Sequence, residues 1–158
     1  MVGPQARLGI GRIAFAIVAV VVFALDRITK SLISTNVPYG QERAAIDHLV
    51  WITNVHNAGA AFGTAPALAT LFLVASMVVA AGLVVYVLRQ PDDPRFNVLL
   101  GMILGGTLGN GYDRVSFGTV TDFIDVHWFP IFNVADSAIS IAVALLIAGY
   151  FLRKPAAA

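Results

Sequence analysis

Cysteine is absent from this sequence, and charged residues are scarce. Without cysteine the chain has no disulfides, no thiol nucleophile and no thiolate metal site. Only 12% of its 158 residues are charged, against about 25% in typical soluble domains, and 58% are hydrophobic. The net charge of +1 and the lack of a long basic run give no reason to expect a nucleic-acid partner. The composition therefore indicates an integral membrane protein, which we interpret as a single domain over residues 1–158.

The sequence also lacks the short motifs of several enzyme classes. His48, His56 and His127 form neither H-E-x-x-H nor any short i,i+4 pair, so we expect ordinary interfacial histidines and no metal site. No G-x-S-x-G or G-x-x-x-x-G-K motif is present, which argues against a serine hydrolase and a phosphate-binding loop. Carboxylate chemistry without a cofactor is the class that remains.

Four apolar segments are long enough, with a few flanking residues, to form membrane-spanning helices. The first segment resembles a secretory signal, but Asp26, Arg27 and Lys30 follow it in place of a small-residue cleavage site. We therefore interpret it as a retained anchor. The predicted helices cover residues 12–33, 66–89, 96–112 and 136–153, with outer connections over 34–65 and 113–135.

The distribution of lysine and arginine predicts the orientation in the membrane. Six of these residues lie on one side of the predicted helices and four on the other, and the richer side is expected to be cytoplasmic. Both termini are then cytoplasmic, and the outer connections place Trp51 and Trp128 at the outer membrane boundary. The six are Arg7, Arg12, Arg89, Arg95, Arg153 and Lys154, and the four are Arg27, Lys30, Arg43 and Arg114.

Both outer connections contain stretches that are typical of extended structure. Residues 49–55 are rich in strand-forming side chains. If residues 120–129 are extended, Asp122 lies on the more apolar face with Val120 and Trp128, and Asp125 lies on the other face. The predicted fold is an all-α membrane bundle of four transmembrane helices, with a small extracytoplasmic β element lying at the membrane surface.

Four of the nine acidic residues, Asp113, Asp122, Asp125 and Asp136, fall within one short stretch. Carboxylates are costly beside hydrocarbon, so such a cluster indicates a functional site. Burial is expected to raise the pKa of Asp122, whereas the start of a helix favours the anion of Asp136. Two carboxyls in such different surroundings can act as acid and base. They can share one proton and activate a water for attack on a peptide carbonyl.

Simpler structural roles are available for each polar residue taken alone. Asp136 could cap a helix, and Asp26 and Lys30 could form a snorkelling i,i+4 ion pair at a helix end. Asp113 and Arg114 could be a charge pair at the membrane boundary. These roles do not explain why the acids converge on one membrane face. Close helix packing could account for Gly105, Gly106, Gly109 and Gly111.

Five motifs in order make the chain resemble the bacterial lipoprotein signal peptidases, also called signal peptidase II. The resemblance covers nearly the whole chain. Arg27 departs from the pattern, since the family often has glutamine there, and Asp125 lies outside the family's catalytic pattern. The motifs are Asp26-Arg27-Ile28-Thr29-Lys30, Asn57-Ala58-Gly59-Ala60-Ala61-Phe62, Gly109-Asn110-Gly111-Tyr112-Asp113-Arg114, Val120-Thr121-Asp122-Phe123 and Phe132-Asn133-Val134-Ala135-Asp136.

The resemblance implies an aspartic endopeptidase in the bacterial cytoplasmic membrane with its active site at the outer face. We expect it to act as a monomer. Its substrates would be prolipoproteins whose lipobox cysteine carries a diacylglyceryl group, cut before that cysteine in contact with membrane lipid. Asp122 and Asp136 would form the catalytic dyad, and Asp26 and Lys30 would be structural or contact substrate. Asp113 would pair with Arg114. The residues that would bind substrate or support the dyad are Asn57, Gly59, Asn110, Asp113, Arg114, Asn133 and Ala135.

Two other classes fit the sequence less well. A proton- or ion-coupled membrane carrier would bind near the bilayer midplane on interrupted helices, whereas these acids gather at one boundary. A non-catalytic interaction subunit would need only glycine-rich helices, and it would keep its function after both dyad aspartates were neutralised.

Overall fold

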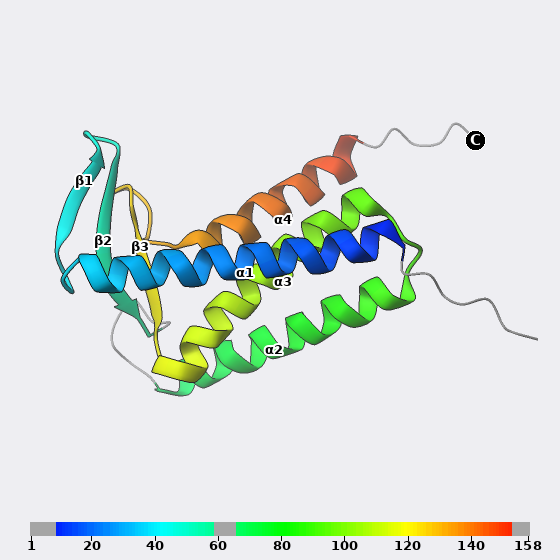
Figure 1. Ribbon diagram of the computed structural model, residues 1–158, viewed down its shortest axis with the longest axis horizontal. Helices are drawn as coiled ribbons and strands as arrows, with labels where there is room; N and C mark the ends of the chain where they lie inside the picture. The colour runs from blue at the N-terminus through cyan, green and yellow to red at the C-terminus, as the bar shows by residue number, and fades with distance from the viewer. Residues whose placement is uncertain (1–8, 59–65, 153–158) are drawn as a thin grey trace, which may run out of the picture.

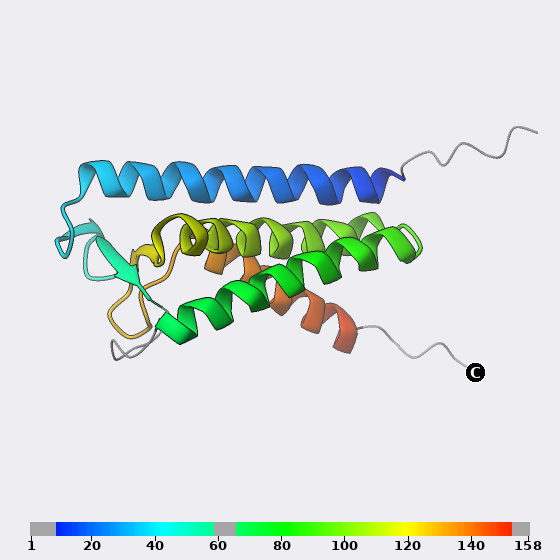
Figure 2. The same cartoon turned by 90° about the horizontal axis from the view of Figure 1, so that it is seen from below.

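In the described part of the chain, four helices run along the length of the molecule, and a three-stranded sheet lies at one end of them (Figure 1). The computed structural model describes residues 9–58 and 66–152. Its elements are α1 (Ile10–Asn36), β1 (Glu42–Ile46), β2 (Val50–Asn57), α2 (Pro66–Arg89), α3 (Pro94–Phe117), β3 (Val120–Asp125) and α4 (Val134–Leu152). Seen from below, α1 lies on one side of α3, and α2 and α4 lie on the other (Figure 2). The chain is therefore mostly helical with a small sheet.

Helix α3 is the central helix, because it packs against α1, α2 and α4. Glycines let the backbones approach closely. A Cβ added to Gly105 would lie 2.5 Å from the carbonyl oxygen of Ala19 on α1. A Cβ on Gly106 would lie 2.6 Å from the carbonyl oxygen of Ala135 on α4. Close packing, the structural role considered for four glycines, applies to these two and to Gly109, where an added Cβ would meet the Asp26 carboxylate, whereas Gly111 has only an ordinary contact at 3.8 Å.

The ends of the helices far from the sheet are tied together by polar contacts. Arg12 on α1 donates to the carbonyl oxygens of Val87, Leu88 and Gln90 at 3.2 Å, at the end of α2. The Asp92 carboxylate, in the loop between α2 and α3, accepts from the backbone N–H of Gly11 at 2.9 Å. These bonds satisfy backbone groups that helix ends leave unpaired.

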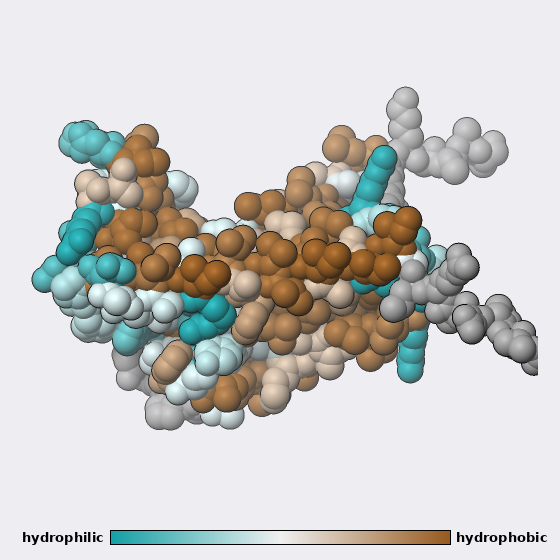
Figure 3. Space-filling model, in the orientation of Figure 1, coloured by the Kyte–Doolittle hydropathy of each residue, from teal (hydrophilic) through white to brown (hydrophobic). Residues whose placement is uncertain are grey.

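The surface of the helical part is largely apolar. Figure 3 shows hydrophobic side chains over the helices, with much of the hydrophilic surface towards the two ends. Within the described residues, two helices are apolar and long enough to cross a membrane, at Thr70–Arg89 in α2 and Val134–Leu152 in α4. Helix α1 also exposes large aliphatic side chains, but α1 and α3 carry charged residues, several of them buried inside the molecule.

Helix α3 extends further towards the sheet than the predicted segment over 96–112, because it continues to Phe117. The apolar run ends at Tyr112, but the next residue, Asp113, is fully buried and paired inside the molecule, so the helix does not stop where the charges begin. Gly118 ends the helix with a left-handed conformation at φ 73°.

The three strands form an antiparallel sheet in the order β1–β2–β3. Val55 of β2 lies opposite Asp122 of β3 in the register. The first four residues of β3 are all buried, so both faces of the strand are covered at this point. The predicted extension of this strand to Trp128 is wrong: β3 ends at Asp125, and His127 has a positive φ of 61° that an extended strand does not allow.

Candidate functional site

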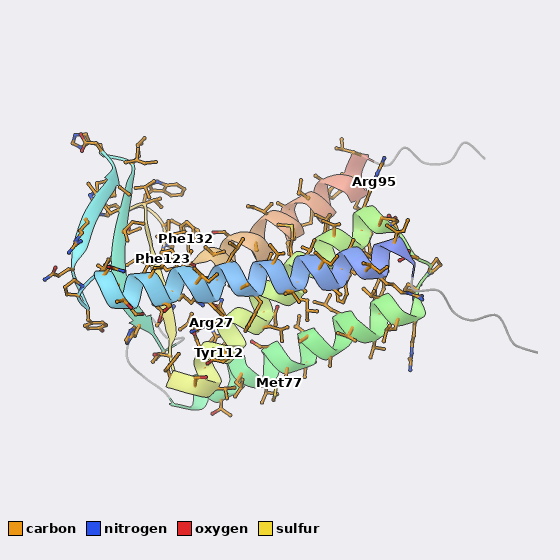
Figure 4. All side chains as sticks on the ribbon, viewed as in Figure 1. Arg27, Met77, Arg95, Tyr112, Phe123 and Phe132 are labelled. Atoms are coloured by element: carbon orange, nitrogen blue, oxygen red, sulfur yellow. The ribbon has the colours of Figure 1, made fainter. Side chains whose placement is uncertain are left out.

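Polar side chains from several elements meet where the helices reach the sheet. Figure 4 shows Arg27 and Tyr112 towards this end of the helices and Phe123 and Phe132 beside the sheet, whereas Arg95 lies at the far end. A buried polar group is costly unless it is hydrogen-bonded or paired, so such a gathering must satisfy its own members. The buried members are Asp26, Lys30, Asn110, Asp113, Thr121, Asp122 and Asn133.

Asp122 lies in β3 with 3% of its surface exposed. Asn57 at the end of β2 donates to its Oδ2 at 3.0 Å, and Asn133 donates to its Oδ1 at 2.6 Å. Burial raises the pKa of Asp122 to about 6, and the charge of Asp136 acts in the same direction, although both asparagine bonds oppose the rise. The predicted rise in the pKa of Asp122 is therefore confirmed.

Asp136 lies in the first turn of α4 and takes part in a capping box with Asn133. The Asn133 side-chain oxygen accepts from the backbone N–H of Asp136 at 3.0 Å, and Asp136 Oδ2 accepts from the backbone N–H of Asn133 at 3.3 Å. The other carboxylate oxygen of Asp136, Oδ1, accepts from Asn110 Nδ2 at 2.7 Å. Asp136 thus contributes to the cap, and it is also held from α3.

Two asparagines connect the carboxylates of Asp122 and Asp136. Asn133 Nδ2 donates to Asp122, and it also lies 3.1 Å from the side-chain oxygen of Asn110. That oxygen accepts from Lys30 Nζ at 2.7 Å. Because an ammonium can only donate, Asn110 must present its oxygen to Lys30 and its NH₂ group to Asp136. Lys30 on α1 therefore sets the orientation of the Asn110 side-chain amide.

Lys30 is buried with its partners, so the Asp26–Lys30 ion pair exists but does not snorkel at a helix end, the simpler role considered from the sequence. Lys30 Nζ lies 2.9 Å from Asp26 Oδ2 and 3.0 Å from Asp113 Oδ2, and all three side chains are at most 2% exposed. Helix α1 continues to Asn36, so this pair lies inside the helix. Asp26 Oδ1 accepts from the backbone N–H of Ala135 at 3.0 Å, which ties α1 to the start of α4.

Asp113 pairs with cations of α1 and not with its neighbour Arg114, contrary to the predicted pair. Arg27 NH1 contacts Asp113 Oδ1, and Lys30 contacts Oδ2. Among the described residues, Arg114 makes no ion pair within 4.0 Å; it donates to the backbone oxygen of Asn110 at 3.4 Å. The reason is geometric, because adjacent residues on a helix point in different directions. Arg114 remains close enough for its charge to interact with Asp136 and Asp122.

A second polar group lies on the sheet, outside the buried cluster. His127 Nε2 is 3.2 Å from Glu42 Oε1 and 3.8 Å from Asp125 Oδ2, and its ring stacks on Trp51 at 3.6 Å. In the described part of the chain these three residues are the group of histidine and acidic side chains that could hold a metal ion. Asp125 therefore points to different partners from Asp122, as predicted from their opposite faces.

Other predicted site residues have mixed outcomes. Asn57 and Ala135 reach the cluster, as described above. Gly59, a predicted substrate-binding residue, lies outside the described residues. Arg27 was not among the predicted site residues, although it lies three positions before Lys30 and so on the same side of α1. That spacing was the available signal, and it could have indicated a second cation in the cluster.

Comparisons with known proteins show the family to which this sequence and fold are similar. A family model described as signal peptidase (SPase) II matches residues 18–152. The lipoprotein signal peptidase of Syntrophomonas wolfei is 40% identical over 80% of this chain and 85% of its own length. That of Caldanaerobacter subterraneus is 42% identical over 88% of this chain and 94% of its own length. A solved bacterial membrane enzyme superimposes with a TM-score of 0.82 at 33% identity, covering 89% of this chain and 94% of the other.

Proposed function

The chain belongs to the signal peptidase II family and removes signal peptides from prolipoproteins, and on that premise we propose that Asp122 and Asp136 are its catalytic dyad. The observation that carries this proposal is their shared connection through Asn133. One asparagine donates to Asp122 and forms the capping box with Asp136, so it holds both carboxylates at the start of α4. The family favours a peptidase over an ion-coupled carrier.

The charges in the cluster support a dyad that holds one proton. Four carboxylates, Asp26, Asp113, Asp122 and Asp136, face three cations. One proton shared by the dyad would bring the cluster to neutrality, which a buried site favours. The pKa of Asp122, raised to about 6, is consistent with such a proton at mildly acidic pH, up to about pH 6. The cations are Arg27, Lys30 and Arg114.

The mechanism follows from this protonation state. The ionised member of the dyad takes a proton from a water molecule, which attacks the peptide carbonyl, while the protonated member donates a hydrogen bond to the carbonyl oxygen. The tetrahedral intermediate then collapses as a proton passes to the leaving amine. Asn57, Asn110 and Asn133 hold the carboxylates in place for these transfers. The route forms no covalent intermediate with the enzyme.

The substrate class and membrane placement complete the proposal. All four helices span the bilayer as one domain, since Asp26 and Lys30 of α1 and Asp113 of α3 are buried and paired where hydrocarbon does not reach them. Both termini are cytoplasmic, and the sheet lies on the outer membrane surface with Trp128, 84% exposed, in the interface. The enzyme acts as a monomer and cuts before a diacylglyceryl-modified cysteine.

Cleavage by purified variants tests the dyad. Asp122→Asn and Asp136→Asn should each abolish cleavage of a lipidated lipobox substrate, because an amide can neither accept the water's proton nor share one. Asp125→Asn is the matched control on the same strand and should keep most of the activity. Full activity in either of the first two variants would remove that residue from the dyad. Equal cleavage of an unlipidated peptide would contradict the proposed substrate class.

A further inference from the structure

Arg27 is a cation in the cluster that the mechanism above does not use. Its side chain is 23% exposed, and its guanidinium contacts Asp113 Oδ1. The guanidinium carbon lies 4.4 Å from the ring centre of Tyr112 and 6.0 Å from that of Phe117. Contacts of a cation with the faces of aromatic rings are attractive. Arg27 is therefore held in one position by α3, on the outer side of the buried carboxylate of Asp113.

Asp113 connects Arg27 to the strand that carries Asp122. Its Oδ2 accepts from the backbone N–H of Thr121 at 3.2 Å, and Thr121 directly precedes Asp122. The carbonyl oxygen of Thr121 in turn lies 3.4 Å from Asn133 Nδ2. Arg27 is thus connected to Asp122 of the proposed dyad through the Asp113 carboxylate and the backbone of Thr121.

We propose that Arg27 is a positioning residue that acts through Asp113 to set the pH range in which the dyad holds one proton. This inference rests on the proposed function, and it adds a determinant to the same site. Arg27 does not touch the reacting atoms. It neutralises Asp113 from the outside, so the dyad experiences less negative charge than the four carboxylates would otherwise create.

Among the described residues, the charged side chains around the dyad lie on α1 and α3. The positive charges are Lys30 and Arg27 on α1 and Arg114 on α3. Lys30 acts on Asp122, Arg114 acts on both dyad carboxylates, and Arg27 contacts Asp113. Asp26 on α1 and Asp113 on α3 are negative. Loss of the Arg27 charge makes this set more negative by one unit. A more negative surrounding favours the protonated form of a carboxyl, so both limbs of the pH profile should move to higher pH.

The size of the shift follows from Coulomb's law. For a charge on the order of 10 Å away at an effective dielectric constant of about 20 to 40, Coulomb's law gives a shift of roughly half to one pH unit. Such a shift is measurable in a profile of kcat/KM against pH. A loss of packing alone would lower the rate without moving the limbs.

The experiment compares the full-length protein and three variants in detergent micelles, with a lipidated lipobox substrate between pH 5 and pH 9. Arg27→Gln should move both limbs upward by roughly half to one pH unit, and Arg27→Lys should restore the original profile because it keeps the charge. Arg43→Gln, on the exposed strand β1, removes the same charge away from the cluster and should leave the profile unchanged. A thermal unfolding curve of each variant confirms that it is folded.

Three results would overturn the role of Arg27. One is coincident profiles of Arg27→Gln and the original protein, and another is an equal loss of rate at every pH. The third is an equal shift in Arg43→Gln, which would make the effect one of net charge. Cleavage by Asp122→Asn, measured in the same assay, tests the proposed function separately. If the proposed dyad is wrong, this variant still cleaves the substrate. An inactive Asp122→Asn with coincident profiles contradicts the role of Arg27 alone.

Discussion

Replacement of Asp122 by asparagine should stabilise the folded protein at neutral pH while it destroys cleavage. Asp122 is 3% exposed and has a pKa of about 6, against about 3.9 for a solvated aspartate. Because the folded state binds this proton more tightly, the contribution of Asp122 to the free energy of unfolding is most favourable below about pH 4, falls as the pH rises through about 6, and then stays low. An asparagine has no such proton, so the variant should lack this loss.

The magnitude follows from the difference between the two pKa values. At about 1.4 kcal/mol per tenfold change in proton affinity, ionised Asp122 lowers the free energy of unfolding at pH 7.5 by about 3 kcal/mol. Asn133 and Asn57 each donate to a different oxygen of the Asp122 carboxylate. An asparagine at this position has only one oxygen, so it can keep only one of these two bonds. The lost bond costs about 1 to 2 kcal/mol. The net gain should be about 1 to 2 kcal/mol at pH 7.5, with no gain at pH 4.

Thermal unfolding in detergent at both pH values measures this effect. The Tm of Asp122→Asn should exceed that of the original protein at pH 7.5 by about 2–8 °C, since about 1 kcal/mol corresponds to about 2–4 °C in a domain of this size. At pH 4 the variant should be equal or less stable. Asp125→Asn removes the same charge from the same strand and controls for net charge. The reasoning is refuted if the difference in Tm between Asp122→Asn and the original protein does not change with pH.

Two further predictions concern the scaffold of the site. Asn133→Ala should lower kcat/KM about 30-fold, the equivalent of one hydrogen bond of about 2 kcal/mol to Asp122. Asn133→Ser should recover about 1 kcal/mol of stability through the cap but not the rate, and an active alanine variant would contradict the bridging role. Gly105→Ala should lower the free energy of unfolding by about 1 to 3 kcal/mol because its methyl group meets the Ala19 backbone. Gly82→Ala, with open space around it, should be neutral or stabilising by up to about 1 kcal/mol, and equal effects of the two substitutions on Tm would refute the packing argument.

The sequence predicted the helices and the strongest polar residues because these depend on local patterns. Apolar runs indicate helices directly, and α2 covers the same residues, 66–89, as the predicted segment. Asp122 could be selected because burial follows from its apolar neighbours. The family motifs then placed Asp136 and Asn133 in the same region, where the structure shows the hydrogen bonds that connect them to Asp122.

Other features depend on contacts between distant segments, which local patterns do not report. Strand β1 contains few strand-forming residues and is exposed along its whole length, and it forms because β2 offers an edge to pair with. The sequence suggested Arg114 as the partner of Asp113 because the two are adjacent. The actual partners, Arg27 and Lys30, lie on another helix more than 80 positions earlier. Such pairings require the packing of α1 against α3, which the glycines of α3 allow.

The bond between Asp26 and the backbone of Ala135 joins residues 109 positions apart. During synthesis, α1 emerges early with Asp26, Arg27 and Lys30, and the groups that satisfy them arrive with α3 and α4. Asp26 and Lys30 can pair within α1, but Asp113 arrives only with α3, and the backbone N–H of Ala135 arrives only with α4. On the proposed dyad, the cleavage machinery is complete only when the polypeptide is complete, because Asp136 arrives with α4, and a truncated product lacking this helix should cut no substrate.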